Sequence, residues 1–140
     1  MPSSYLFSYG TLQPSKAPPE VRPLVRRLVP IGAATTRGEL YDVGSYPGAT
    51  FGPDVPSVVH GRVYRLPDRE TLSKLDVYEE ATPDAGRLFV RRRVVARLSD
   101  GRRVRCWAYE YNRPTDTMRR LTSGRFVRRA GGTTGAPKAA

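Results

Sequence analysis

Two strand-like runs within residues 88–112 restrict the possible folds of this chain more than any other segment does. They are joined at Asp100-Gly101, a dipeptide that favours the two-residue type I′ turn of a β-hairpin. Apolar and basic residues alternate along both runs, which is typical of strands with one covered face. The segment therefore predicts an antiparallel hairpin that forms part of a barrel wall.

The type I′ turn also fixes which residues should face each other across this hairpin. It predicts Arg91 opposite Glu110 and Val94 opposite Trp107. One face would then carry Leu88, Val90, Val94, Ala96, Leu98, Trp107, Tyr109 and Tyr111. The opposite face would mix Phe89 and Val95 with Arg91, Arg93 and Arg97.

The rest of the chain reads as short strands with little helix. Residues 5–9 form an aromatic and apolar run cut off by a glycine, which indicates a buried strand that enters a tight loop. Residues 31–41 and 58–66 also read as strands. A brief helix is predicted at 22–28 and a loop at 44–48.

The clearest helix begins after Asp68, a residue suited to capping its first turn. At about 100° per residue, Leu72, Leu75 and Tyr78 form one apolar stripe. Glu79 falls at an angle between those of Leu72 and Leu75. An acidic side chain is thus predicted where an apolar one should be.

Strands interrupted by one good helix predict an α+β domain built around a small mixed β-barrel. We expect a single domain over residues 1–128 and a disordered tail of basic and small residues at 129–140. No apolar run is long enough for a membrane span or a secretory signal, so the protein is expected to be cytoplasmic.

The net charge of +11 is unevenly distributed along the chain. Residues 113–140 hold seven basic residues and one acid, and thus contribute +6 of this charge. A basic surface favours acidic partners. Cys106 is the only cysteine; in a strand beside Trp107 it is expected to be a core residue and not a nucleophile.

Two segments carry candidate chemistry. Burial in an apolar stripe would raise the pKa of Glu79, so that it could accept and return a proton near neutral pH. The alternative is that Glu79 turns outward or pairs with the basic run 91–93. Tyr9-Gly10-Thr11 follows a strand, and its main-chain N–H groups could hold an anion. An ordinary glycine turn is the alternative there.

Five segments, taken in order, resemble the AIG2-like gamma-glutamylcyclotransferase family over about residues 5–127. They are Tyr9-Gly10-Thr11-Leu12, Gly38-Glu39-Leu40-Tyr41-Asp42 with Tyr46-Pro47-Gly48, His60-Gly61-Arg62-Val63-Tyr64-Arg65-Leu66, Leu75-Asp76-Val77-Tyr78-Glu79, and Trp107-Ala108-Tyr109-Glu110-Tyr111. The resemblance implies a compact barrel with short flanking helices that uses no metal or organic cofactor.

The family resemblance also implies an activity. Members release 5-oxoproline and a free amine from gamma-glutamyl compounds, because the substrate's α-amine attacks its own γ-carbonyl. The family's substrate-binding loop corresponds to Tyr9, Gly10, Thr11 and Leu12, and its catalytic glutamate corresponds to Glu79. The expected partner is a small gamma-glutamyl substrate. Glu80 is the rival for the catalytic role.

Two positions depart from the family pattern. Phe89 stands where related proteins often carry a tyrosine, and Arg125 stands where an acid commonly follows the glycine of the C-terminal motif. Because the hydroxyl is missing, the sequence does not predict which amine the substrate releases. It does not predict the oligomeric state either.

The sequence also allows two functions other than the predicted enzymatic activity. One is a catalytically silent ligand-binding domain of the same fold. The other is nucleic-acid binding, because phosphate contacts and base stacking could use the hairpin's basic and aromatic residues. The arginines concerned are Arg91, Arg92, Arg93, Arg97, Arg102, Arg103 and Arg105. Without a recognised nucleic-acid motif, only non-specific binding is expected.

Overall fold

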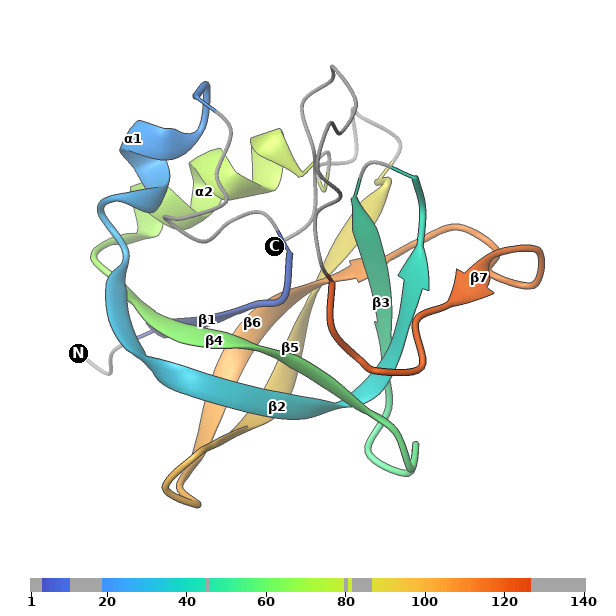
Figure 1. The fold of residues 1–140 in the computed structure, drawn as a ribbon. Helices are drawn as coiled ribbons and strands as arrows, with labels where there is room; N and C mark the ends of the chain where they lie inside the picture. The colour runs from blue at the N-terminus through green and yellow to red at the C-terminus, as the bar shows by residue number, and fades with distance from the viewer. Residues whose placement is uncertain (1–3, 11–18, 45, 80, 82–86, 127–140) are drawn as a thin grey trace.

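The structure of the protein is a computed structural model, drawn in Figure 1. It describes residues 4–10, 19–44, 46–79, 81 and 87–126.

The described residues form strands β1 to β7 and helices α1 and α2. The strands are β1 (Ser4–Ser8), β2 (Val29–Asp42), β3 (Pro47–Phe51), β4 (Val58–Leu66), β5 (Phe89–Leu98), β6 (Arg103–Tyr111) and β7 (Arg119–Arg120). The helices are α1 (Arg22–Val25) and α2 (Arg69–Tyr78).

Within the described residues, five strands close into a barrel in the order β2-β4-β1-β6-β5, and β5 pairs back onto β2. The β1–β6 pair is parallel and the other barrel pairs are antiparallel, so the barrel is mixed. Both helices lie on the side where β1 and β4 run (Figure 1). The predicted α+β barrel with short flanking helices is confirmed.

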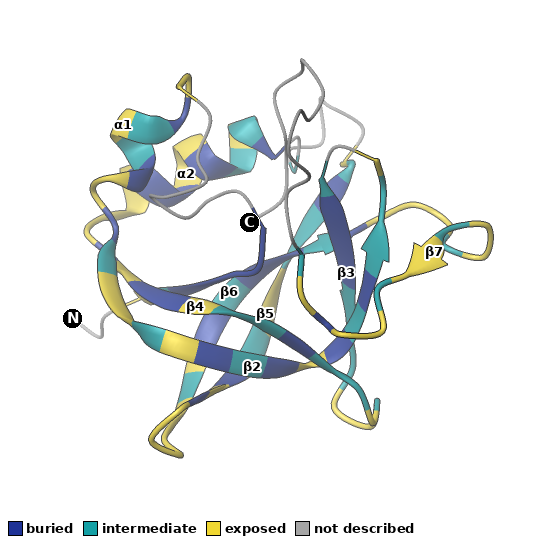
Figure 2. Ribbon diagram, viewed as in Figure 1, coloured by how far each residue is buried: buried dark blue, intermediate teal, exposed yellow. Residues whose placement is uncertain are grey.

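The barrel is filled by buried residues that its strands contribute (Figure 2). Strand register places Phe7 opposite Val63 and Ala34 opposite Leu98, and all four are buried. Cys106 is also buried, as predicted for a core residue. Burial raises the pKa of its thiol to about 12, so the thiol stays protonated at neutral pH.

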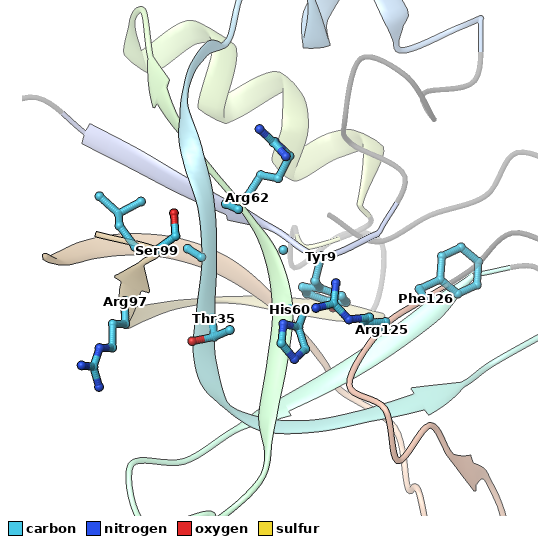
Figure 3. A pocket seen from close by; sticks show the side chains of 12 residues that line it. Tyr9, Thr35, His60, Arg62, Arg97, Ser99, Arg125 and Phe126 are labelled. Carbon is cyan, nitrogen blue, oxygen red and sulfur yellow. The ribbon is translucent and has the colours of Figure 1, made fainter. Parts of the chain in front are cut away.

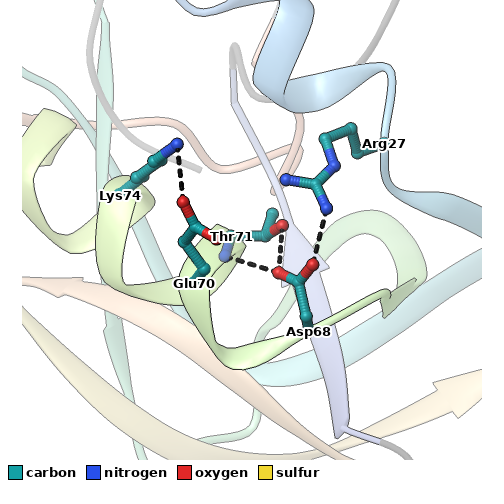
Figure 4. A network of polar contacts seen from close by, with 5 residues as sticks. All are labelled: Arg27, Asp68, Glu70, Thr71 and Lys74. Atoms are coloured by element: carbon teal, nitrogen blue, oxygen red, sulfur yellow. Dashed lines mark hydrogen bonds and ion pairs between the residues drawn. The ribbon is translucent and has the colours of Figure 1, made fainter.

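Helix α2 begins where the sequence predicted. The Oδ1 atom of Asp68 accepts hydrogen bonds from the Thr71 main-chain N–H at 2.8 Å and from the Thr71 hydroxyl at 2.7 Å (Figure 4). The Asp68 Oδ2 atom lies 2.5 Å from Arg27 Nη2, just after α1. Leu72 and Leu75 are buried, as the predicted stripe requires. The cap fixes where α2 begins, and the stripe fixes which face of α2 packs inward.

The turn of the β5–β6 hairpin differs from the predicted type I′ turn. The Gly101 N–H donates to Leu98 O at 2.9 Å, and the Leu98 N–H donates to Arg102 O at 2.8 Å. Gly101 has a φ of +93°. This is the three-residue loop in which a left-handed glycine follows a type I turn.

The extra loop residue shifts the pairing by one position, so the predicted register was wrong. Arg91 faces Tyr109 and not Glu110, and Val94 faces Cys106 and not Trp107. A one-residue shift also exchanges faces. Trp107, Tyr109 and Tyr111 therefore share a face with Phe89, Arg91 and Arg93, not with Val94 and Leu98.

Other boundaries also differ from the predictions. The loop predicted at 44–48 ends early because β3 begins at Pro47. A Cβ on Gly48 would lie 2.7 Å from the Tyr111 ring, so this close β3–β6 contact depends on a glycine. Helix α1 covers only part of the predicted 22–28 segment, and the predicted tail at 129–140 lies outside the described residues.

A search of the described part of the chain for membrane-spanning helices found none of sufficient length and apolarity.

Candidate active site

Glu79 follows the last turn of α2 and is completely buried. Its main-chain N–H donates to Leu75 O at 2.9 Å, so the helical path continues to this residue. The periodicity of the stripe correctly predicted an inward side chain, and the outward alternative was wrong. Glu80, the rival carboxylate, lies outside the described residues.

Tyr9 and Gly10 follow the end of β1 and are both buried. The Tyr9 hydroxyl donates a 2.5 Å hydrogen bond to Tyr109 O and accepts one of 3.3 Å from the Ala49 main-chain N–H. These bonds tie the end of β1 to β6 and β3. The Tyr9 side chain thus fixes the bend that contains Gly10. Thr11 and Leu12, the other predicted binding residues, lie outside the described residues.

The raised pKa values of Tyr9 and Tyr109 show that Glu79 and Tyr9, one from each predicted segment, are within electrostatic range. Burial is the largest cause that raises the pKa of Tyr9 well above its ordinary value, and the charge of Glu79 is the next. Burial followed by Asp76, with a further contribution from Glu79, raises the pKa of Tyr109 in the same way. Because such effects require nearby charges, Glu79 lies within electrostatic range of the Tyr9 and Tyr109 hydroxyls.

A polar network beside Glu79 was not predicted from the sequence. The Asp76 Oδ2 atom pairs with Arg91 Nη1 at 2.9 Å, and the Tyr109 hydroxyl donates to Asp76 Oδ1 at 2.6 Å. Arg91 and Tyr109 are direct cross-strand neighbours, whereas the predicted register put them on opposite faces. Asp76 thus anchors the last turn of α2 to β5 and β6.

Replacing Asp76 by alanine is expected to lower the free energy of unfolding by about 2 kcal/mol, because it removes a charged partner from both Arg91 and Tyr109. Chemical denaturation measures this change. Glu70→Ala, which breaks the exposed Glu70–Lys74 pair on the same helix, should change it by only about 0.5 kcal/mol. Equal losses in the two variants would contradict an anchoring role for Asp76.

Ser8 is a second polar residue of this region that the sequence did not reveal. It is fully buried, and its hydroxyl has no hydrogen-bond partner among the described residues. Alternation along β1 and the parallel pairing of Leu6 with Trp107 bring Ser8 level with Tyr109 on one face. The only sequence signal was a hydroxyl within an aromatic and apolar strand.

Several hairpin arginines, considered above for nucleic-acid binding, have partners within the protein. The guanidinium groups of Arg91 and Arg93 lie 4.5 and 4.3 Å from the Trp107 ring centroid. Arg92 pairs with Glu110 at 3.0 Å. The Trp107 ring, the largest stacking surface on the hairpin, is therefore covered by the protein's own cations.

No group of three or more His, Cys, Asp or Glu side chains in the described ranges is arranged to hold a metal ion. Glu79 lies within electrostatic range of the hydroxyls of Tyr9 and Tyr109.

Comparison with known proteins agrees with this arrangement of strands. The model of the family described as "Gamma-glutamyl cyclotransferase, AIG2-like" matches residues 6–128. The chain belongs to this family. The matched range includes the buried Glu79 and the bend at Tyr9-Gly10.

Relatives of this AIG2-like protein include the "Gamma-glutamylcyclotransferase family protein YtfP" of Escherichia coli K12. YtfP is 34% identical over 91 residues, which cover 65% of this chain and 69% of YtfP. The solution structure of E. coli YtfP matches with a TM-score of 0.62 and 28% identity, over 88% of this chain and 96% of that one.

Two further structures share the fold at lower identity. YkqA from Bacillus subtilis has a TM-score of 0.67 and 23% identity; the match covers 89% of this chain but only 40% of YkqA. An AIG2-like protein from Mus musculus has a TM-score of 0.63 and 21% identity, over 79% of this chain and 78% of that one.

Phe89, the first departure from the family pattern, is a core residue. It is fully buried, and its ring centroid lies 5.5 Å from that of Tyr111 and 6.1 Å from that of Tyr46. At this position an aromatic ring fills the space between β5, β6 and the start of β3.

Proposed function

We propose that this protein converts a gamma-glutamyl amine or amino acid into 5-oxoproline and the free amine. Two findings support this function: membership of the AIG2-like family, and a fully buried carboxylate within electrostatic range of Tyr9, the first residue of the segment that resembles the family's binding loop. The single observation that carries the proposal is the burial of Glu79 within electrostatic range of Tyr9.

In the proposed reaction, the substrate's α-amine attacks its own γ-carbonyl carbon. A C–N bond forms to close the five-membered ring, and the original amide C–N bond breaks. Glu79 removes one proton from the α-ammonium, and the attacking nitrogen loses a second proton to water once the ring C–N bond has formed. Glu79 delivers its proton to the leaving nitrogen, so the carboxylate is regenerated, and the released amine takes up a proton from water. Burial disfavours the charged form of a carboxylate, which suits a group that must hold and release a proton.

The remaining site residues are proposed to hold the substrate. The segment Tyr9, Gly10, Thr11 and Leu12 would bind the glutamyl α-carboxylate and amine, with main-chain N–H groups as donors. Because the attack is intramolecular, orientation alone gives a high effective molarity. The Asp76–Arg91–Tyr109 network would keep Glu79 in place beside this loop.

The proposal is tested with purified protein and a panel of gamma-glutamyl amino acids and amines. We expect release of 5-oxoproline, measured by chromatography coupled to mass spectrometry, from at least one member of the panel. Binding of panel members without release would indicate the silent ligand-binding domain. Absence of both would overturn the proposal.

Replacing Ser8 by alanine is expected to lower kcat/KM about tenfold, which corresponds to about 1.4 kcal/mol of transition-state stabilisation. We infer a contact with the substrate because this buried hydroxyl lies on the face of Tyr109 and has no partner among the described residues. Stability should be unchanged or slightly higher, because a desolvated hydroxyl is removed.

Thr36→Val is the matched control for this prediction. The Thr36 hydroxyl is also buried, but it donates to Val95 O at 2.8 Å. This control should lose about 1 kcal/mol of stability and keep its kcat/KM. If Ser8→Ala shows the same pattern as Thr36→Val, the hydroxyl of Ser8 has a structural role and does not contact the substrate.

A further inference from the structure

A cavity of about 630 Å³ lies beside the candidate active site, over β2 and β4 and against the segment that follows β7. This volume is within the range of small-molecule sites, roughly 300–1,000 Å³. Figure 3 shows the side chains that line it. They include Tyr9, Thr35, His60, Arg62, Ser99 and Arg125.

The lining of this cavity is cationic. Arg62, Arg97 and Arg125 contribute to it, and none of the described residues that line it is acidic. Arg62 and Arg125 form no ion pair with any acid in the described part of the chain. By contrast, Arg91 and Arg92 on the hairpin each pair with a carboxylate.

Arg125 is brought to the cavity by a tight main-chain contact. The His60 N–H donates to Gly124 O at 2.8 Å, which holds this segment against β4. Gly124 has a φ of +68°, and a Cβ there would lie 2.1 Å from Val58 O. Burial lowers the pKa of His60, and the neighbouring Arg125 lowers it further. Figure 3 shows Arg125 and His60 beside Tyr9, with Arg97 further away.

Three observations join the cavity to the candidate active site. Tyr9 lines the cavity and also lies within electrostatic range of Glu79. Arg62 is the cross-strand partner of Ser8 in the β1–β4 pair, so both side chains are on one face of the sheet. The cavity therefore adjoins the bend after β1, and a molecule held at that bend would have Arg62 and Arg125 in the adjoining cavity.

We propose that this cavity receives the leaving-amine half of the substrate, and that Arg62 and Arg125 select gamma-glutamyl compounds whose leaving amine carries an acidic side chain. This inference rests on the proposed function and names its substrate class. Arginine matches carboxylates in charge and geometry. The same cations repel leaving groups that end in an amine, so the site discriminates by attraction and by repulsion.

The test compares gamma-glutamyl-glutamate with gamma-glutamyl-glutamine, which have nearly the same shape but differ in the charge of the leaving residue. We expect kcat/KM to be at least about tenfold higher for gamma-glutamyl-glutamate. In Arg62→Gln/Arg125→Gln this ratio should fall below about threefold. Arg105→Gln, which removes an exposed strand arginine outside the cavity, should leave the ratio and both rates unchanged.

Calorimetric titration of the two dipeptides into Glu79→Gln protein separates this inference from the proposed function. If no dipeptide yields 5-oxoproline but gamma-glutamyl-glutamate binds more tightly, and the arginine substitutions remove the difference, the cyclotransferase function fails and the acidic subsite stands. Equal affinities and equal kcat/KM values for the two dipeptides would overturn the subsite. So would a preference that persists in Arg62→Gln/Arg125→Gln.

Discussion

Glu79→Gln is expected to lower the rate of 5-oxoproline release by at least about 100-fold, because a glutamine of the same shape can neither accept nor return the proton. The free energy of unfolding should stay equal or increase, since the substitution removes a fully buried carboxylate. Product release by mass spectrometry and denaturation with guanidinium measure the two effects.

Glu110→Gln is the matched control for this substitution. Glu110 is a carboxylate of the barrel whose Oε2 accepts from the Phe51 N–H at 2.7 Å and whose Oε1 pairs with Arg92. It should lose stability by about 1–2 kcal/mol and keep its activity. If Glu110→Gln loses activity and Glu79→Gln keeps it, Glu79 is not the proton carrier. If Glu80→Gln silences the enzyme and Glu79→Gln does not, Glu80 is the proton carrier.

Gly61→Ala is expected to cost about 3 kcal/mol of stability or more, close to the largest effect of a single added methyl group. A Cβ at this position would lie 2.2 Å from Ser8 O and 2.8 Å from the Phe7 ring. Neither neighbour can move freely, because β1 is paired on both sides, with β4 and β6. Thermal unfolding and soluble yield measure the loss.

Gly52→Ala separates this clash from the general effect of replacing a glycine. The nearest atom to an added Cβ at Gly52 is Val55 Cγ2 at 3.0 Å, the end of a side chain. This variant should lose less than about 1 kcal/mol. Gly61→Ala protein that is as stable as Gly52→Ala would show that β1 and β4 can separate, contrary to the structure.

The β5–β6 hairpin was predicted from the sequence, but its register was not. Both strands of the hairpin were predicted, because alternation and turn residues are local properties. The predicted register was wrong because Asp100-Gly101 fits both a two-residue type I′ turn and a three-residue loop that ends in a left-handed glycine. Contacts of the strands with the rest of the barrel decide between these two turns. In the observed register Arg91 faces Tyr109, and both reach Asp76. The network of Asp76, Arg91 and Tyr109 could therefore not be predicted, because the predicted loop was one residue too short.

Strand β3 was missed for a related reason. Pro47 and Gly48 are turn residues by composition, and they form a strand only because β2 pairs with them and Tyr111 needs the space that a glycine leaves. The hydroxyl of Ser8 gave only a weak signal, since its position level with Tyr109 depends on the parallel pairing of β1 with β6.

The sequence alone determined the cap and stripe of α2 and predicted an inward Glu79, because helical periodicity fixes directions within one element; burial in the structure removed the outward alternative. The sequence also determined the family, through five motifs in order. The tertiary structure decided which groups lie near Glu79: the hydroxyls of Tyr9 and Tyr109, with Arg62 and Arg125 in the cavity that Tyr9 also lines. Such neighbours depend on register and barrel closure, which arise from contacts between residues far apart in the chain.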